Sequence, residues 1–245
     1  MSRAAARGLF GVTLLVLAWE LAARGLHLPA YTLPAFSDIL RSVWDQRASL
    51  LRAGGVTLAE ALAGYAIGSA IGIGLAVLLV VLPWTRRAIM PALLAINSVP
   101  VAAFSPLVLL WLGLGWSSKI VMVALAVGFT VFLSALAGFD RVDARTVGLL
   151  RSFGAGPFAI LWRLRLPTAL PLIAAGMRVA TVRSLIVAIV TEMLGAYGGL
   201  GWIIYQAVVQ IDFVQVWSAI FVASAISLAF FGLIGAAERR IVFWK

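Results

Sequence analysis

The segment RSFGAGPFAILWRLRLPTALP, residues 151–171, decides how this chain is organised. Arginines, prolines and two closely spaced glycines interrupt a chain that is otherwise apolar enough to lie in a bilayer. Gly154 permits the left-handed turn that ends a helix, and Gly156-Pro157 restarts the chain because proline is acceptable in a first helical turn. The segment therefore predicts two short helices joined by a tight bend, the second over residues 158–166.

Apolar side chains gather on the first of these helices, where Leu149, Leu150 and Phe153 precede the bend. Arg151 and the arginines of the second helix form a basic rim around them. A rigid helix-bend-helix with apolar residues at its surface favours docking of another protein. Periodicity alone leaves a second interpretation open, an amphipathic loop that lies on anionic lipid.

Composition assigns the segment to a membrane protein. Hydrophobic residues make up 63% of the 245 residues and charged residues 11%, and the mean hydropathy is +1.09, far from the values of ordinary soluble domains. We therefore expect an all-α integral membrane protein with one transmembrane domain over residues 1–245. The net charge of +10 is explained by arginines in cytoplasmic loops, so nucleic-acid binding is not inferred. The absence of cysteine excludes disulfides and thiolate metal sites.

Apolar runs long enough to cross about 30 Å of hydrocarbon predict six transmembrane helices. They cover residues 8–23, 57–82, 89–112, 118–137, 171–194 and 216–237. The first run also has the form of a signal peptide, with arginines before a short apolar stretch. Trp19 and Glu20 stand where small cleavage-site residues are expected, which favours an uncleaved helix.

Other patterns refine this arrangement. Residues 28–53 are mixed in character, and the amphipathic stretch 37–52 predicts a surface helix. The second span carries a small-residue face for close helix contact, made of Gly64, Gly68, Gly72 and Gly74. The third span is interrupted by Pro91, Pro100 and Pro106.

Loop charges predict the orientation in the membrane. With the amino terminus inside, five basic residues lie outside: Arg24, Arg41, Arg47, Arg52 and Lys119. Twelve lie inside: Arg3, Arg7, Arg86, Arg87, Arg141, Arg145, Arg151, Arg163, Arg165, Arg239, Arg240 and Lys245. Both termini are therefore expected in the cytoplasm, and residues 140–166 form the largest cytoplasmic loop, between the fourth and fifth spans.

This loop resembles the signature loop of bacterial ABC-importer permeases, written Glu-Ala-Ala, three residues, Gly, nine residues, Ile-x-Leu-Pro. Gly154 is followed after nine residues by Leu164-Arg165-Leu166-Pro167, whereas Gly148-Leu149-Leu150 stands in place of Glu-Ala-Ala. The resemblance implies a coupling helix that fits a groove on an ATPase subunit. The coupling residues are then Leu149, Leu150, Arg151, Phe153, Gly154, Leu164, Arg165, Leu166 and Pro167.

Three further stretches extend the resemblance over most of the chain. They are SVPVAAFSPLVLLWLGLGWSSKI at 98–120, ALPLIAAGMRVA at 169–180 and VTEMLGAYGGLGWIIYQA at 190–207. These stretches are similar to the permeases for nitrate, sulfonate, taurine and bicarbonate, a group that includes pyrimidine and riboflavin permeases. The resemblance implies a type I ABC importer in the bacterial cytoplasmic membrane. Its other parts would be two ATPase subunits, a second permease copy and an extracytoplasmic solute-binding protein.

The sequence carries no nucleotide-binding motif of its own. A P-loop needs a lysine that reaches the phosphates, and the only lysines, Lys119 and Lys245, lie in no such motif. We therefore expect no cofactor in this chain, with ATP and Mg on the partner ATPase. An intramembrane serine protease would need a histidine beside a serine, whereas the sole histidine, His27, lies just past the first span. An ion-coupled secondary transporter is the harder alternative, disfavoured by few ionisable residues in the spans and no clear internal repeat.

Five polar residues within the spans are predicted to line the translocation pathway: Asn97, Ser98, Ser105, Arg183 and Glu192. Arg183 lies about 18 Å into the fifth span, close to the midplane. It could attract a small anion such as a sulfonate, or pair structurally with carbonyls or with Glu192. Glu192 is more readily explained as a structural hydrogen-bonding group. Residues 195–202, too rich in glycine for a continuous helix, predict an outer turn where a delivery protein docks.

Overall fold

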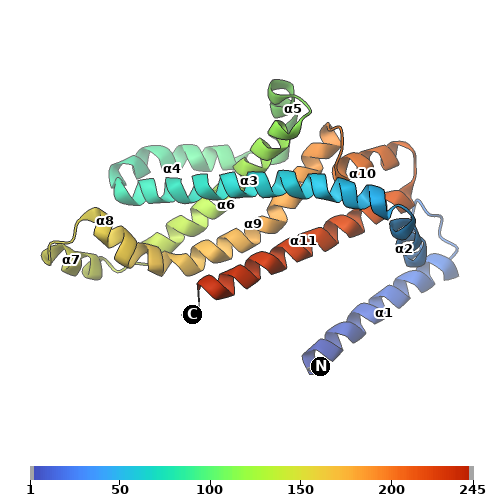
Figure 1. The fold of residues 1–245 in the computed structure, drawn as a ribbon, viewed down its shortest axis with the longest axis horizontal. Helices are drawn as coiled ribbons and strands as arrows, with labels where there is room; N and C mark the ends of the chain where they lie inside the picture. The colour runs from blue at the N-terminus through green and yellow to red at the C-terminus, as the bar shows by residue number, and fades with distance from the viewer. Residues whose placement is uncertain (1–2, 243–245) are drawn as a thin grey trace.

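The computed structural model describes residues 3–242, and all regular secondary structure in that range is helical (Figure 1). Lys245 lies outside the described residues. The helices are α1 (Arg3–Gly25), α2 (Phe36–Asp45), α3 (Arg47–Val81), α4 (Pro83–Ser98), α5 (Val101–Leu112), α6 (Trp116–Asp140), α7 (Ala144–Ser152), α8 (Pro157–Ile160), a π-helical turn (Leu161–Arg165), α9 (Leu166–Leu194), α10 (Leu200–Val209) and α11 (Phe213–Ile241).

Close contact between α3 and α6 forms the centre of the bundle. A Cβ atom at Gly64, Gly68 or Gly72 would collide with the backbone of α6, so these positions require glycine. This confirms three members of the predicted small-residue face. Gly74 has no neighbouring atom within 4 Å and does not belong to the contact. Helix α9 packs on the same α6, where Gly138 meets Ala169.

Within residues 3–242, four helices are long and apolar enough to cross a membrane: Arg47–Val81, Trp116–Asp140, Pro157–Leu194 and Phe213–Ile241. Helices α4 and α5 together satisfy the same test but are bent by 91°, so they are a broken span or a re-entrant loop. Only Pro100, at the bend, interrupts this segment, because Pro91 and Pro106 lie inside helices. The structure thus accounts for four or five of the six predicted spans, and α1 is not among them.

Two sequence predictions about helix ends are wrong. The stretch 37–52 is not one surface helix, because α2 ends at Asp45 and the second half begins the long helix α3. The second short helix was expected to end at residue 166 and the fifth span to begin at Pro171, but residues 157–194 run as one helix of 38 residues. The π-helical turn just before Pro167 has a wider hydrogen-bonding pattern, and such a turn can absorb the missing proline amide without a break.

Helix α1 stands apart from the bundle over most of its length (Figure 1). It is attached near its carboxyl end, where the Trp19 ring lies 5.0 Å from the Trp217 ring of α11. The Trp19 indole also donates a hydrogen bond of 2.9 Å to the Pro34 carbonyl. Its exposed apolar residues, among them Phe10, Leu14 and Leu17, are not covered by any other described part of the chain.

Candidate functional site: the two ends of the helix bundle

Helices α7 and α8 form a hairpin, residues 144–165, at one end of the bundle (Figure 1). The Asp143 carboxylate caps α7 by accepting a hydrogen bond of 3.0 Å from the Arg145 amide. Gly154 has φ +81°, a conformation that glycine adopts without the penalty of a side chain, and α8 begins at Pro157. The predicted helix-bend-helix is therefore present in the structure.

The hairpin exposes large apolar side chains. Leu149 is 57% exposed and Phe153 79%, as the sequence suggested, and Phe158 and Trp162 add further apolar surface that the motif did not indicate. The alternation of apolar and basic residues at 162–165 was the available signal for Trp162. Exposed apolar surface of this kind marks an interaction site.

The other predicted coupling residues differ in how exposed their side chains are. Arg151 and Pro167 are exposed, whereas Leu150, Leu164 and Leu166 are half-buried. The half-buried Arg165 donates a hydrogen bond of 3.3 Å to the Val80 carbonyl of α3. Arg165 thus fastens the base of the hairpin to the bundle.

A cluster of polar residues lies at the opposite end of the bundle, inside it. This polar cluster consists of Thr57 and Glu60 of α3, Lys119 of α6 and Glu192 of α9, each at most 2% exposed. The Thr57 hydroxyl lies 2.8 and 3.0 Å from the two carboxylate oxygens of Glu192 and accepts a 2.8 Å hydrogen bond from the Leu200 amide. The Gly201 amide donates a 2.7 Å hydrogen bond to Glu192. Glu192 therefore joins α3, α9 and α10.

Lys119 connects the loop before α6 to the turn after α9. Its ammonium donates hydrogen bonds to the carbonyls of Leu114, at 2.6 Å, and Gly195, at 2.5 Å. The sequence suggested that Lys119 belongs to the outer loops, whereas the structure buries it completely. Ionisable residues within apolar helices were a visible signal for this site, but only the fold brings Glu60, Lys119 and Glu192 together.

The glycine-rich turn after α9 is built around Glu192. Gly199 has φ +97°, and a Cβ atom there would collide with the Glu192 carboxylate. A Cβ atom at Gly201 would collide with the Ile189 carbonyl. The predicted non-helical run 195–202 is correct up to Gly199, but α10 begins at Leu200.

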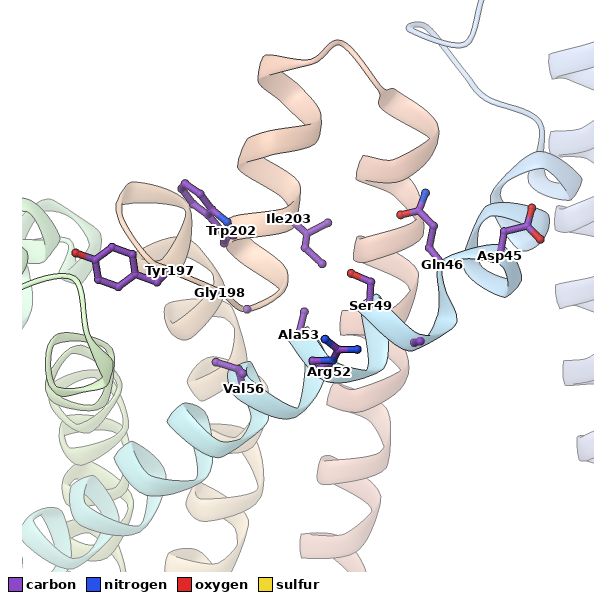
Figure 2. Close-up of a pocket in the computed structure, with 12 residues that line it drawn as sticks. Asp45, Gln46, Ser49, Arg52, Ala53, Val56, Tyr197, Gly198, Trp202 and Ile203 are labelled. Atoms are coloured by element: carbon purple, nitrogen blue, oxygen red, sulfur yellow. The ribbon is translucent and has the colours of Figure 1, made fainter.

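The turn forms one wall of an open cavity of about 620 Å³ (Figure 2). Figure 2 shows Arg52 and Ser49 of α3 facing the turn and the start of α10. Tyr197, 83% exposed, and Trp202 supply the aromatic part of the lining. With Asp45 also in its lining, the cavity combines a cation, a carboxylate, hydroxyls and aromatic surface.

The structure does not bring the predicted pathway residues together with Glu192. Arg183 is exposed on α9, and its guanidinium donates a hydrogen bond of 3.2 Å to the Thr130 hydroxyl of α6. Asn97 lines a mainly apolar cavity of about 360 Å³ enclosed by α3, α6 and the bent α4–α5 pair. Ser98 is exposed and bonds to its own helix, whereas Ser105 is buried with its hydroxyl unpaired.

Comparisons with known proteins agree with this architecture. Residues 68–243 match the family described as "Binding-protein-dependent transport system inner membrane component". The formylaminopyrimidine transport permease protein ThiX of Halalkalibacterium halodurans is 31% identical over 241 residues, 97% of this chain and 94% of the relative. The taurine transport system permease protein TauC of Escherichia coli is 30% identical over 204 residues, 83% of this chain and 71% of the relative.

Solved structures share the fold. A chain of the methionine ABC transporter MetNI in an inward-facing conformation has a TM-score of 0.67 at 21% identity, covering 81% of this chain and 96% of that chain. A chain of a bacterial alginate ABC transporter, solved in complex with a pentasaccharide-bound periplasmic protein, has a TM-score of 0.66 at 18% identity, covering 96% and 94%.

Long apolar helices, packed through glycine and carrying an apolar hairpin at one end, define a multi-pass membrane transport protein. The chain belongs to the inner membrane component family of binding-protein-dependent transport systems, the permease subunits of ABC importers. The family is one of transport permeases, so both the protease and the secondary-transporter interpretations are set aside.

Proposed function

We propose that the hairpin is the surface through which a partner ATPase drives this permease. The observation that carries the proposal is the apolar surface of Leu149, Phe153, Phe158 and Trp162, exposed beside arginines at one end of the bundle. Four such side chains on a rigid bend suit a protein groove better than a lipid surface, because the bend fixes their relative positions. ATP and Mg would be bound by two ATPase subunits, and this chain would move with them.

The test of the hairpin is substitution of Phe153 by alanine in the complex purified from membranes. We expect binding of the ATPase to weaken about tenfold or more, because exposed aromatic anchors dominate interfaces. Leu233→Ala is the matched control, since Leu233 is 69% exposed on α11, away from the hairpin. Normal recovery of the ATPase with Phe153→Ala, alone or combined with Gly154→Val, would count against the coupling role.

We propose six membrane spans with both termini in the cytoplasm. Helix α1 would be the first span, since it has 23 residues and exposes apolar side chains between Phe10 and Leu21. The hairpin would then be cytoplasmic and the polar cluster would lie near the outer surface. The chain has no cysteine, so single cysteines at Phe153 and Tyr197 can be labelled cleanly from either side of the membrane. Labelling of both positions from the same side would overturn this topology.

The solute pathway is proposed to form between two copies of this chain, on the face of α9 that carries Arg183. An exposed arginine within a membrane-spanning helix is costly in lipid, so protein or water must cover it. A second copy with its own Arg183 would enclose a basic pathway suited to a small anion. Arg183→Gln should then reduce anion uptake while leaving dimerisation intact, and unchanged uptake would remove Arg183 from the pathway.

An extracytoplasmic binding protein is proposed to deliver the solute at the outer end. The alignment with the alginate transporter chain, which was solved with a periplasmic protein, supports this arrangement. A sulfonate, taurine, nitrate or bicarbonate fits the basic pathway, and relatives named for taurine and aliphatic sulfonates support that class. A pyrimidine or riboflavin is the second candidate, favoured by ThiX and the riboflavin permease of Chloroflexus aurantiacus. Purifying the native complex and screening its binding protein against both classes decides between them.

A further inference from the structure

The polar cluster contains two acids and one base inside a membrane-spanning bundle. Glu60, Lys119 and Glu192 are each at most 2% exposed. Burying a charge is costly unless it is paired and hydrogen-bonded. If all three groups were ionised, the cluster would keep one negative charge without a partner. A single proton shared between the carboxyl groups makes the cluster neutral.

Hydrogen bonding indicates which carboxyl group carries that proton. Glu192 faces two donors, the Thr57 hydroxyl and the Gly201 amide, and an ionised carboxylate is the group that only accepts. Glu60 lies within hydrogen-bonding reach of Glu192, yet its Oε2 has no partner. Two ionised carboxylates cannot bond to each other, so one must donate a proton. Glu60 is the donor, because an ionised Glu60 would leave a charged oxygen buried without a donor.

We propose that the polar cluster is a neutral positioning device, in which Glu60 is protonated and the charge of Lys119 balances that of Glu192, and that it fixes the turn 195–199 for docking of the binding protein. The inference rests on the proposed function for the identity of the docked partner. Glu192 and Lys119 are positioning residues, and they act through the turn.

The turn is fixed at both of its ends. At the start of the turn, the Lys119 ammonium donates a hydrogen bond to the Gly195 carbonyl. At its end, the Glu192 carboxylate lies against Gly199 and accepts a hydrogen bond from the Gly201 amide. Between these anchors Tyr197 projects into solvent, 83% exposed, and lines the cavity of Figure 2. The same carboxylate is bound to α3 through Thr57. A movement of α9 against α3 would therefore move the turn.

The experiment compares Glu60→Gln with Glu192→Gln in the complete transporter complex. A glutamine at 60 can donate to Glu192 as the protonated carboxyl does, whereas a glutamine at 192 turns an amide donor toward Thr57 or Gly201. Each variant carries a single cysteine in place of Tyr197, labelled with a nitroxide. We expect Glu60→Gln to leave the label spectrum unchanged and Glu192→Gln to make the label markedly more mobile.

A functional readout separates positioning from a general loss of fold. ATP hydrolysis is measured against the concentration of the binding protein that copurifies with the native complex, in chains that keep Tyr197. Glu192→Gln should raise the half-maximal concentration about tenfold with little change in the maximal rate, because one hydrogen-bonded charge is lost. Glu60→Gln should leave both quantities near their original values.

Charge balance supplies a second comparison. Lys119→Met alone leaves a buried carboxylate without its cation and should lower the thermal stability strongly. The double variant Lys119→Met with Glu192→Gln is again neutral, so its stability should recover, while the label at position 197 stays mobile.

If Glu60→Gln and Glu192→Gln gave the same label mobility and the same half-maximal concentration of binding protein, the proton assignment would be overturned. An immobile label in the double variant would overturn the positioning role. A complex whose ATP hydrolysis does not respond to any binding protein would instead contradict the proposed function, and the label spectra would still test the cluster.

Discussion

The hairpin and the polar cluster lie at opposite ends of the bundle. Each departs from the usual arrangement, in which apolar side chains are buried and charged side chains are exposed. The hairpin carries Phe153 and Trp162 on its surface, whereas the polar cluster holds Glu60, Lys119 and Glu192 in the interior. Exposed apolar surface at the hairpin is stabilised only when a partner covers it. Buried charges at the other end are satisfied within the chain and determine the position of a turn. One end thus exposes apolar side chains without cover from the described chain, and the other is organised by its own contacts.

The largest effect is expected at the turn that the polar cluster supports. Gly199→Val introduces a side chain at φ +97° and against the Glu192 carboxylate, so it should lower the free energy of unfolding by about 2–5 kcal/mol. The adjacent Gly198 has no atom within 4 Å of an added Cβ, so Gly198→Ala should change stability by less than about 0.5 kcal/mol. Thermal unfolding of the detergent-purified chain measures both, and equal losses would show that Glu192 does not restrict the turn.

A smaller loss is expected when the cluster loses a hydroxyl. Thr57→Val leaves the Leu200 amide without an acceptor and removes one of the donors to the Glu192 carboxylate, which should cost about 2–3 kcal/mol. Thr57→Ser keeps the hydroxyl and removes only a methyl group, so the loss should be about 1 kcal/mol. Chemical denaturation distinguishes the two. A serine variant as unstable as the valine variant would mean that packing, and not hydrogen bonding, governs the site.

A backbone change at the bend of the hairpin should alter the bend and leave the rest of the bundle unchanged. Gly154→Ala places a side chain at φ +81° with no neighbouring atom, so strain of about 1 kcal/mol should distort the bend without lowering overall stability. Binding of the ATPase should weaken several-fold. Gly148→Ala, a change within α7 that also meets open space, should preserve binding. Titration of ATPase onto the reconstituted permease measures both, and equal affinities would argue against a role for the bend.

The smallest effect is expected for the ion pair beside the hairpin. Arg86 and Asp140 form two hydrogen bonds, of 2.9 and 2.8 Å, but both side chains are more than 40% exposed. Exposed pairs contribute little, so a double-mutant cycle of Arg86→Gln and Asp140→Asn should give a coupling of about 0.5 kcal/mol. A coupling well above about 1 kcal/mol would mean that the pair is shielded from water, contrary to its exposure.

The sequence predicted the hairpin well because its signals are local. A glycine at the bend, a proline at the next helix start and apolar residues between arginines act within a few residues of each other. The same local reasoning failed at Pro167 and Pro171, where a proline expected to end or begin a helix lies within one continuous helix. A preceding π-helical turn and packing on α6 sustain that helix, and neither is visible in a single stretch of sequence.

By itself the sequence determined that this protein is a helical membrane protein with a sharp bend between two of its helices, because hydropathy, glycine and proline act through the nearby chain. Only the tertiary structure decided which polar residues act together. Glu192 meets Thr57 across 135 positions, and Lys119 reaches Gly195 across 76. Such pairs are set by how α3, α6 and α9 pack, since a buried charge is stable only where the fold supplies partners for it.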